Sequence, residues 1–453
     1  MTEIPLQQTP PPQPLQRSRR RLAFRILLWL VALTIIGLGW IVLLASVAPS
    51  RLDFSGAGAI LMVCAPPVLL AVLGWTGLQF VSRSTSASFP PDSASLSSPA
   101  PEAAAAPAVP LVRLRIGAWS ALTPHGAVVE TVDASQARKQ VFKPDKTILH
   151  PSGYPAHAAS IDSLVPDAPG NIAATRLRAP RVTAMLIAIL DDLHAQQGAL
   201  VRSVDGAVGV YWLAPEALGS GGEAHAAFFA LAWRQSAWRD LPYALQATAA
   251  AAAASSLYSV LSAMQSGAAQ PAAACTIIVG ADSLLDPEEL APALALGQVF
   301  SSDAQQGFIP AEGAGGMLLW HPDLAPEQLW ANAPVLGPVG MVAPGTATDA
   351  SLHSAMAAAI LASGKDAVEI AHVVSDGDHR PQASMAAVTA MLQLLPALDP
   401  LQQRLSPMES AGSFGIAADL VHLVLAVELA NEQPALALCA NGGQCAGVVV
   451  MPA

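Results

Sequence analysis

The 453-residue sequence predicts an α/β layered domain that follows two transmembrane helices. Strand-like and helix-like apolar runs alternate from Leu111 to the C-terminus, which is typical of α/β folds. Two uncharged apolar segments long enough to cross a bilayer precede this region. Only 12% of the residues are charged and 53% are apolar, as expected for a large buried core. The net charge of −11 comes without a basic cluster in the domain, which argues against nucleic-acid binding, and the apolar content excludes disorder along the whole chain.

Residues 1–21 form a basic tail that is rich in proline and glutamine. Prolines recur between Pro5 and Pro14, and arginines follow from Arg17 onward. Such a composition cannot build a packed core, so the tail is expected to be disordered.

Residues 22–81 predict a transmembrane helical hairpin. The first span runs from about Ile26 to Val47 and the second from about Gly58 to Val81, and neither contains a charged residue. About 20 consecutive apolar residues suffice to cross a bilayer. The first span is longer than the apolar region of a signal peptide, so it is interpreted as a retained anchor.

The basic residues that flank the spans predict the orientation of the hairpin. Several arginines, up to Arg25, precede the first span, and Arg83 follows the second. The loop between the spans holds only Arg51, opposed by Asp53. Cytoplasmic flanks carry the excess of Lys and Arg, so both termini are expected in the cytoplasm, with the chain in a bacterial inner membrane. The lipid bilayer is therefore one predicted partner.

A linker and a folded domain follow the hairpin. Residues 82–110 are rich in serine, proline and alanine and are expected to be extended and mobile. The domain is expected over residues 111–453. Its predicted strands are Val112–Trp119, Ala207–Leu213, Thr276–Gly280, Met317–Trp320, Val368–Val374, Leu436–Cys439 and Val448–Met451. Its predicted helices are Val182–Gln197 ending at Gly198, Ala249–Gln265 ending at Gly267, Leu352–Ala362 ending at Gly364, Ala383–Leu395 and Ile416–Leu429.

Two motifs in this domain resemble those of β-ketoacyl synthases of the thiolase superfamily. One is the apolar run at residues 277–286, which ends in Gly-Ala-Asp-Ser-Leu-Leu-Asp. The other, more specific, is Gly-Phe-Ile-Pro-Ala-Glu-Gly-Ala at residues 307–314. Weaker matches lie at residues 114–126 and 441–446. The resemblance implies a thiolase-like duplicated α/β layered sandwich, in which two halves share five layers. It also implies a homodimer, or a heterodimer with a ketosynthase-like protein.

The side chains that carry catalysis in that family are replaced in this sequence. Ala250 stands where the resemblance places the nucleophilic cysteine, before a helix that ends at Gly267. Asp376 stands at the position of the first histidine, and Gly412 at that of the second. Pro407 falls near the position of the lysine. These three degenerate positions, Ala250, Asp376 and Gly412, predict a pseudoenzyme without catalytic residues.

Other residues are candidates for chemistry that has moved from the family positions. Ser413 lies in a relaxed nucleophile-elbow pattern, but the polar segment before it does not look like a strand. His379 lies three residues after the first histidine position. Cys439 and Cys445 do not show a usual zinc spacing, and free thiols are the simpler interpretation. The sequence therefore indicates no cofactor and no metal.

Three hypotheses for function remain. The first is a structural or interaction component of a bacterial inner-membrane assembly, such as an accessory protein of a secretion system with protein partners. The second is a non-catalytic partner of an active ketosynthase, like a chain-length factor in acyl-chain or polyketide synthesis. The third is an enzyme whose chemistry moved to Ser413, Cys445 or Asp376.

Overall fold

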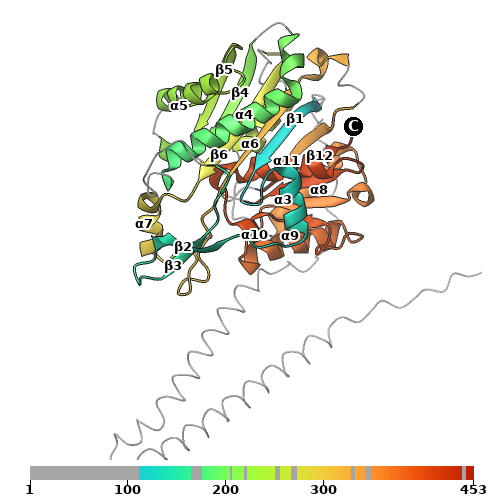
Figure 1. Ribbon diagram of the computed structural model, residues 1–453. Coiled ribbons are helices and arrows are strands. Elements are labelled where there is room, and N and C mark those ends of the chain that lie inside the picture. Colours follow the sequence, from blue (N-terminus) through green and yellow to red (C-terminus); the bar gives the residue numbers. More distant parts are fainter. Residues whose placement is uncertain are drawn as a thin grey trace, which may run out of the picture. The chain divides into compact units, whose positions relative to one another are not determined.

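The computed structural model describes most of the predicted domain (Figure 1). The described residues are 112–164, 176–204, 207–218, 222–249, 256–266, 273–327, 332–342, 349–440 and 445–453. They all belong to the compact unit Ala106–Ala453. The predicted tail, hairpin and linker lie outside the described residues, as does Ala250. Among the described helices, none combines the length and the apolar character that a membrane span requires.

A ten-stranded mixed sheet runs through the domain. Its order is β10-β9-β11-β12-β8-β1-β7-β6-β4-β5. The first-half strands are β1 (Leu114–Leu122), β4 (Val208–Ala214), β5 (Tyr243–Ala249), β6 (Cys275–Ser283) and β7 (Glu312–Trp320). The second-half strands are β8 (Val335–Val342), β9 (His372–Ser375), β10 (Arg404–Leu405), β11 (Ala435–Cys439) and β12 (Cys445–Met451).

The strand order repeats between the two halves. If each half is counted from its own first strand, both follow the order third, second, fourth, fifth, first. In both halves the fifth strand, β7 or β12, is antiparallel to its two neighbours. A short antiparallel pairing of Leu114 with Leu336 and of Arg115 with Val335 joins the half-sheets. The predicted duplicated α/β architecture is confirmed by this repeat.

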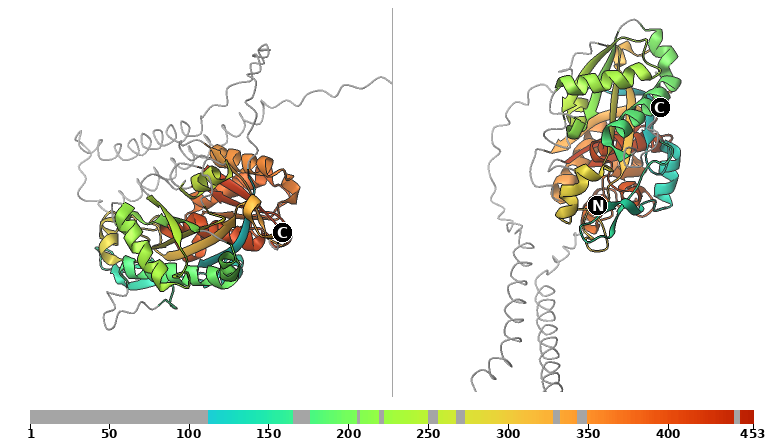
Figure 2. Two further views of the ribbon diagram at one scale, coloured as in Figure 1. Left: turned by 90° about the horizontal axis from the view of Figure 1, so that it is seen from above. Right: turned by 60° about the vertical axis from the view of Figure 1, so that its left-hand side comes forward.

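Helices cover and separate the two half-sheets (Figures 1 and 2). Helices α4 (Arg178–Arg202) and α5 (Gly222–Gln235) cover the outer side of the first half. Helices α8 (Asp349–Ser363) and α9 (Pro381–Leu394) cover the outer side of the second. Between them lie α6 (Ser256–Gln265) and α11 (Ala418–Leu429). The smaller helices are α3 (Val128–Gln136), α7 (Pro287–Ala295), α10 (Met408–Ala411), η2 (Glu216–Leu218), η3 (Pro322–Leu324), η5 (Ala367–Glu369) and η6 (Gly415–Ala417).

Helix α11 explains much of the apolar composition. Every residue from Ala418 to Val427 is buried, including the polar Asp419 and His422. Its apolar side chains share one core with residues of both half-sheets, such as Leu319 of β7 and Ala437 of β11. A helix that is apolar on all sides must be enclosed by other elements, and here the two half-sheets enclose it.

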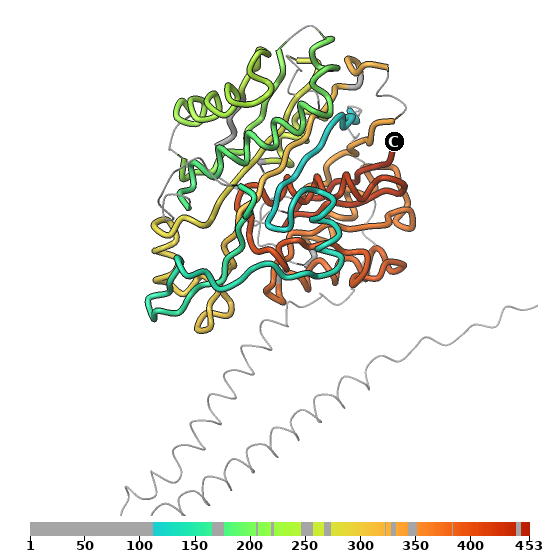
Figure 3. Tube along the Cα trace, viewed as in Figure 1, coloured from blue at the N-terminus to red at the C-terminus, as the bar shows by residue number. Residues whose placement is uncertain are grey.

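A two-stranded arm extends from the first half. It consists of β2 (Lys143–Leu149) and β3 (Pro155–Ala158), which pair antiparallel. The arm runs beside the segment that leads into β7 (Figure 3), where the His157 amide donates to the Phe300 carbonyl at 3.0 Å. The Ala159 amide likewise donates to the Pro310 carbonyl at 3.1 Å. The arm therefore supports the Gly-Phe-Ile-Pro motif.

Most predicted strands coincide with observed ones, and the near-continuous apolar run at 276–280 lies in β6, whose residues are all buried. The start of the predicted strand Val368–Val374 is wrong. Residues 367–369 form η5, because Asp366 and Glu369 make a reciprocal capping box, and β9 begins only at His372.

Two helix predictions also need correction. Ala249 is the last residue of β5 and not part of a helix, and α6 begins at Ser256. Gly198 does not end α4, which continues to Arg202. A Cβ at position 198 would lie 2.5 Å from the His194 ring, so this glycine makes room for packing within the helix. Gly364, by contrast, follows α8 with φ +73°, as a helix stop requires.

Candidate functional site

Asp376 lies directly after β9, at the carboxyl edge of the second half-sheet. Its Oδ2 accepts a hydrogen bond from the Ala440 amide at 2.6 Å, just beyond β11. Burial raises the pKa of the Asp376 carboxyl to about 6, and the nearby Asp378 carboxylate adds to the shift. The position that the resemblance assigns to a histidine thus holds an acid fixed to the backbone of the neighbouring strand.

Gly412 has a backbone that only glycine adopts easily. Its φ is +88°, and a Cβ added there would lie 2.7 Å from the Ile309 carbonyl oxygen and 2.9 Å from the Ile309 Cγ2. A histidine at this position would need both a strained backbone and a shift of the Ile309 segment. The residues around position 412 therefore leave no space for a side chain there.

The structure brings together two motifs that are far apart in the sequence. The Ser413 amide donates to the Ile309 carbonyl at 2.8 Å, and the Ala311 amide donates to the Ser413 carbonyl at 3.1 Å. Helix α10 precedes Gly412, so no strand leads into Ser413 and the nucleophile-elbow geometry is missing. The Gly-Phe-Ile-Pro motif acts here as a backbone platform beneath residues 412–413.

The glutamate of the same motif has a structural role. Glu312 is fully buried and forms an ion pair with Arg181 of α4, which also has little exposure. Its carboxylate further accepts from the Ile161 amide at 2.5 Å and from the Ser283 hydroxyl at 3.2 Å. With these donors in place the buried charges are compensated, so Glu312 ties α4 to the sheet.

Arg404 is a residue that the sequence analysis missed. Its side chain is only 7% exposed, and Nη2 donates to Glu409 at 2.6 Å. Nη1 donates to the hydroxyls of Ser406 at 2.5 Å and Ser375 at 3.2 Å. A signal was available, because Arg404 is the only Lys or Arg after Arg380. A cation is therefore present three residues before Pro407, the position near which the resemblance places the lysine. This cation forms an ion pair with Glu409.

A histidine and a serine also meet at this edge. The Nε2 of His125 lies 2.9 Å from the Ser410 hydroxyl, and Ser410 is buried in α10. Burial, with a smaller effect of Lys139, lowers the pKa of His125 to about 4. The sequence placed His125 only in a weak motif match, and the pairing depends on a contact across 285 residues.

The two C-terminal cysteines are buried thiols. Cys439 pairs across the β11–β12 hairpin with Ala446, so Cys445, one residue before Ala446, faces the other side of the sheet. Both are free. Burial raises the pKa of Cys445, and Asp376 raises it further, which disfavours the nucleophilic thiolate. Within the described ranges, no group of three or more His, Cys, Asp or Glu side chains is arranged to hold a metal ion.

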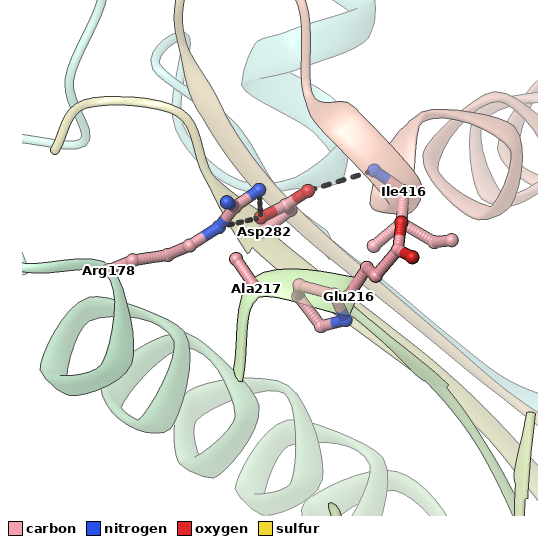
Figure 4. Close-up of a pocket in the computed structure, with 6 residues that line it drawn as sticks. Arg178, Glu216, Ala217, Asp282 and Ile416 are labelled. Carbon is pink, nitrogen blue, oxygen red and sulfur yellow. Dashed lines mark hydrogen bonds and ion pairs between the residues drawn. The ribbon is translucent and has the colours of Figure 1, made fainter. Parts of the chain in front are cut away.

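A polar pocket of about 470 Å³ lies at the carboxyl ends of β4 and β6 (Figure 4). The Asp282 carboxylate accepts from the Arg178 Nε and Nη2, each at 2.8 Å, and from the Ile416 amide at 3.0 Å. Burial raises the pKa of Asp282, and the Arg178 guanidinium opposes this. Arg178 also pairs with Glu289. The charges in this pocket therefore connect α4, β6 and η6 to each other.

His379 packs against Phe300, in the segment that the arm contacts. Its ring contacts Phe300 edge-to-face, with the ring centroids 5.0 Å apart. Burial lowers its pKa. This packing gives His379 a place in an aromatic contact with the segment that supports the Gly-Phe-Ile-Pro motif.

Comparison with known proteins establishes the fold. No family model matches the chain, and no curated protein matches it. Three solved ketosynthase structures align with it over nearly their whole length. The ishigamide ketosynthase/chain length factor aligns with a TM-score of 0.54 at 17% identity, over 75% of this chain and 99% of that one. The fold is that of the ketosynthases.

Two further structures support this assignment. A type II polyketide synthase acyl-carrier protein in complex with its ketosynthase, bound to the hexaketide, aligns with a TM-score of 0.58 at 13% identity, over 76% of this chain and 100% of that one. A β-ketoacyl synthase from Burkholderia phymatum aligns with a TM-score of 0.53 at 15% identity, with coverage of 76% and 100%. The aligned share matches the extent of the ketosynthase-like domain in this chain.

Proposed function

We propose that this chain is a membrane-anchored, catalytically inactive ketosynthase-fold protein. It acts as a structural or interaction component of a bacterial inner-membrane assembly, and a secretion-system accessory protein is the specific form that we favour. The ketosynthase-like fold and the predicted hairpin together support a domain that presents surfaces at the cytoplasmic side of a membrane.

Gly412 carries this proposal. A condensing enzyme of the family requires a histidine where the resemblance places Gly412. Here φ is +88° and the Ile309 carbonyl occupies the space that a Cβ needs. A histidine at this position would need a rearranged backbone and a shifted Ile309 segment, and this supports an inactive site.

Asp376 supports the proposal through its charge. With a pKa of about 6, the Asp376 carboxyl is ionised for the most part at pH 7 and above. A carboxylate at this position repels a malonyl group, whereas a histidine attracts it and assists the loss of CO₂. The cation of Arg404 does not offset this charge, because it pairs with Glu409.

The experiment is covalent labelling followed by capture of partners. The full chain is purified in detergent, treated with cerulenin and analysed by mass spectrometry, with an active ketosynthase as the positive control. We expect no adduct on the chain. In-cell cross-linking should then link the domain to protein partners. If cells that lack every neighbouring envelope or secretion gene give the same yield of cross-linked partners, an assembly role of this kind is contradicted.

A chain-length-factor-like partner is the second candidate. The observation in its favour is the structural likeness to a ketosynthase/chain length factor, in addition to the degenerate positions. Co-expression with a ketosynthase encoded nearby should then give a heterodimer on size-exclusion chromatography. A chain that stays apart from every such ketosynthase would leave only the assembly role.

A further inference from the structure

The outer helices of the second half expose large apolar side chains. Leu361 in the last turn of α8 is 82% exposed, and Met385 and Leu392 of α9 are 58% and 56% exposed. Val368 of η5, which follows α8, is 81% exposed. We call the surface formed by these four residues the α8/α9 face.

This face differs from the outer face of the first half in charge. Helix α9 has no charged residue, and α8 has only Asp349, at its first position. The corresponding helices of the first half, α4 and α5, contain Arg178, Arg181, Asp191, Asp192, Arg202, Glu223 and Arg234. A solvated helix normally carries charges on its outer side, so the α8/α9 face is built for contact with an apolar environment.

The exposed apolar side chains of α9 lie on one side of the helix. Met385 and Leu392 are seven residues apart, which is two helical turns and places them on one side of α9. Helix α8 packs beside α9, and its Leu361 is exposed as well. The face therefore presents apolar side chains from both helices rather than one isolated exposed leucine.

The charges around this face cancel. Lys365 pairs with Glu369 at 2.9 Å, and Arg380 pairs with Asp378. The Arg113 side chain, at the C-terminal end of α8, and the Asp366 carboxylate, just after it, add one further cation and one further anion. Although the chain as a whole carries −11, this part of the surface does not repel an anionic environment.

The polypeptide enters the domain at this same place. The Arg113 Nη2 donates to the Ser363 carbonyl at the C-terminal end of α8, at 3.2 Å. The Val112 amide donates to the Gln265 carbonyl at 2.9 Å. The first described residues, Val112 and Arg113, therefore connect to the last turn of α8, where Leu361 lies.

We propose that the α8/α9 face docks on the surface of the lipid bilayer that holds the predicted hairpin. This inference rests on the membrane anchor in the proposed function. The segment between the second predicted span and the first described residue is 82–111. As a flexible coil it spans about 30 Å, so the bilayer is at a high effective concentration for a face beside its attachment point.

The chemistry of the face predicts how it binds. Leucine and methionine side chains enter the interfacial region of a bilayer, and binding strengthens with the apolar area that they bury there. The face offers no excess of Lys or Arg, so anionic lipid headgroups add little attraction. Docking should therefore depend weakly on salt and on the fraction of anionic lipid.

The test places a water-sensitive fluorophore on the face in the full chain. Leu361→Cys and Leu392→Cys are labelled with bimane in single-copy lipid nanodiscs, once with neutral and once with anionic lipid. Leu231→Cys on α5, 48% exposed in the native chain, is the matched control on the first half. The unsubstituted chain gives the background from the native cysteines.

We expect iodide quenching at positions 361 and 392 to be at least threefold weaker than at position 231, in both lipids and in 50 or 500 mM salt. Equal quenching at all three positions would overturn the proposal. Protection that appears only when two copies share a disc would also overturn it, because the occupant would then be a second copy. A chain that fails to enter nanodiscs at all would refute the anchor itself, which separates failure of the proposed function from failure of the docking.

Discussion

The carboxyl of Asp376 should make the domain less stable as the pH rises, and Asp376→Asn should remove this dependence. Its pKa in the folded chain is about 6, against an ordinary value of 3.8. The folded chain therefore holds this proton more tightly than the unfolded chain does. The contribution to stability is fully present below pH 3.8 and is lost as the pH rises through about 6.

The magnitude follows from the size of the shift. A difference of about 2 pKa units corresponds to about 3 kcal/mol between the protonation states, which is an upper value. Asparagine keeps an oxygen that can accept from the Ala440 amide but does not ionise. Asp376→Asn should therefore raise the free energy of unfolding by up to about 3 kcal/mol at pH 7.5, and by far less at pH 4.

The assay is thermal unfolding of the full chain in detergent, measured across this pH range for both variants. Asp240→Asn is the control, because the Asp240 side chain is 77% exposed. The Tm gain of Asp376→Asn should grow between about pH 4 and 6 and then level off. A gain that does not change with pH, or a loss at pH 7.5, would refute the description of Asp376 as a buried acid.

Three further predictions concern the packing of the site. Gly412→Ala should lower the free energy of unfolding by about 2 kcal/mol or more. The control Gly153→Ala, with φ +85° but open space around it, should lower it by only about 1 kcal/mol. Equal effects in chemical denaturation would contradict the close contact at position 412. Arg404→Met should cost about 3 kcal/mol because it leaves Glu409 without its cation, and the double variant with Glu409→Gln should recover part of this loss; no recovery would argue against the pair. Burial raises the pKa of Cys275 to about 12, so iodoacetamide should modify it at pH 8 only after unfolding, as followed by mass spectrometry.

The fold was predictable because its signals are local. The apolar run of β6, the Gly-Phe-Ile-Pro segment before β7 and the glycine stop after α8 each act within about ten residues. The element boundaries that were predicted wrongly depend on competing local interactions, such as the capping box of Asp366 at the start of the predicted strand Val368–Val374. The prediction that α4 ends at Gly198 is wrong for a different reason, because this glycine makes room for the His194 ring and does not end the helix.

The candidate site was predictable only where a motif marks it. Asp376 and Gly412 stood out because a known pattern expects other residues there. Arg404 and the His125–Ser410 contact have no such pattern, and they arise when β10 and α10 meet segments that are distant in sequence. The α8/α9 face likewise depends on which side of each helix the sheet covers. The scarcity of charged residues in these two helices does not by itself show which side is exposed.

The central claim is that this ketosynthase fold does not condense. The most direct measurement is a single-turnover reaction of the purified full chain with an acyl thioester primer and malonyl-acyl carrier protein, followed by mass spectrometry of the carrier. We expect no β-ketoacyl product above the level without enzyme, while an active ketosynthase in a parallel reaction gives full conversion. Product formation that depends on this chain, and that falls when Asp376 or Ser413 is replaced by alanine, would contradict the proposed inactivity.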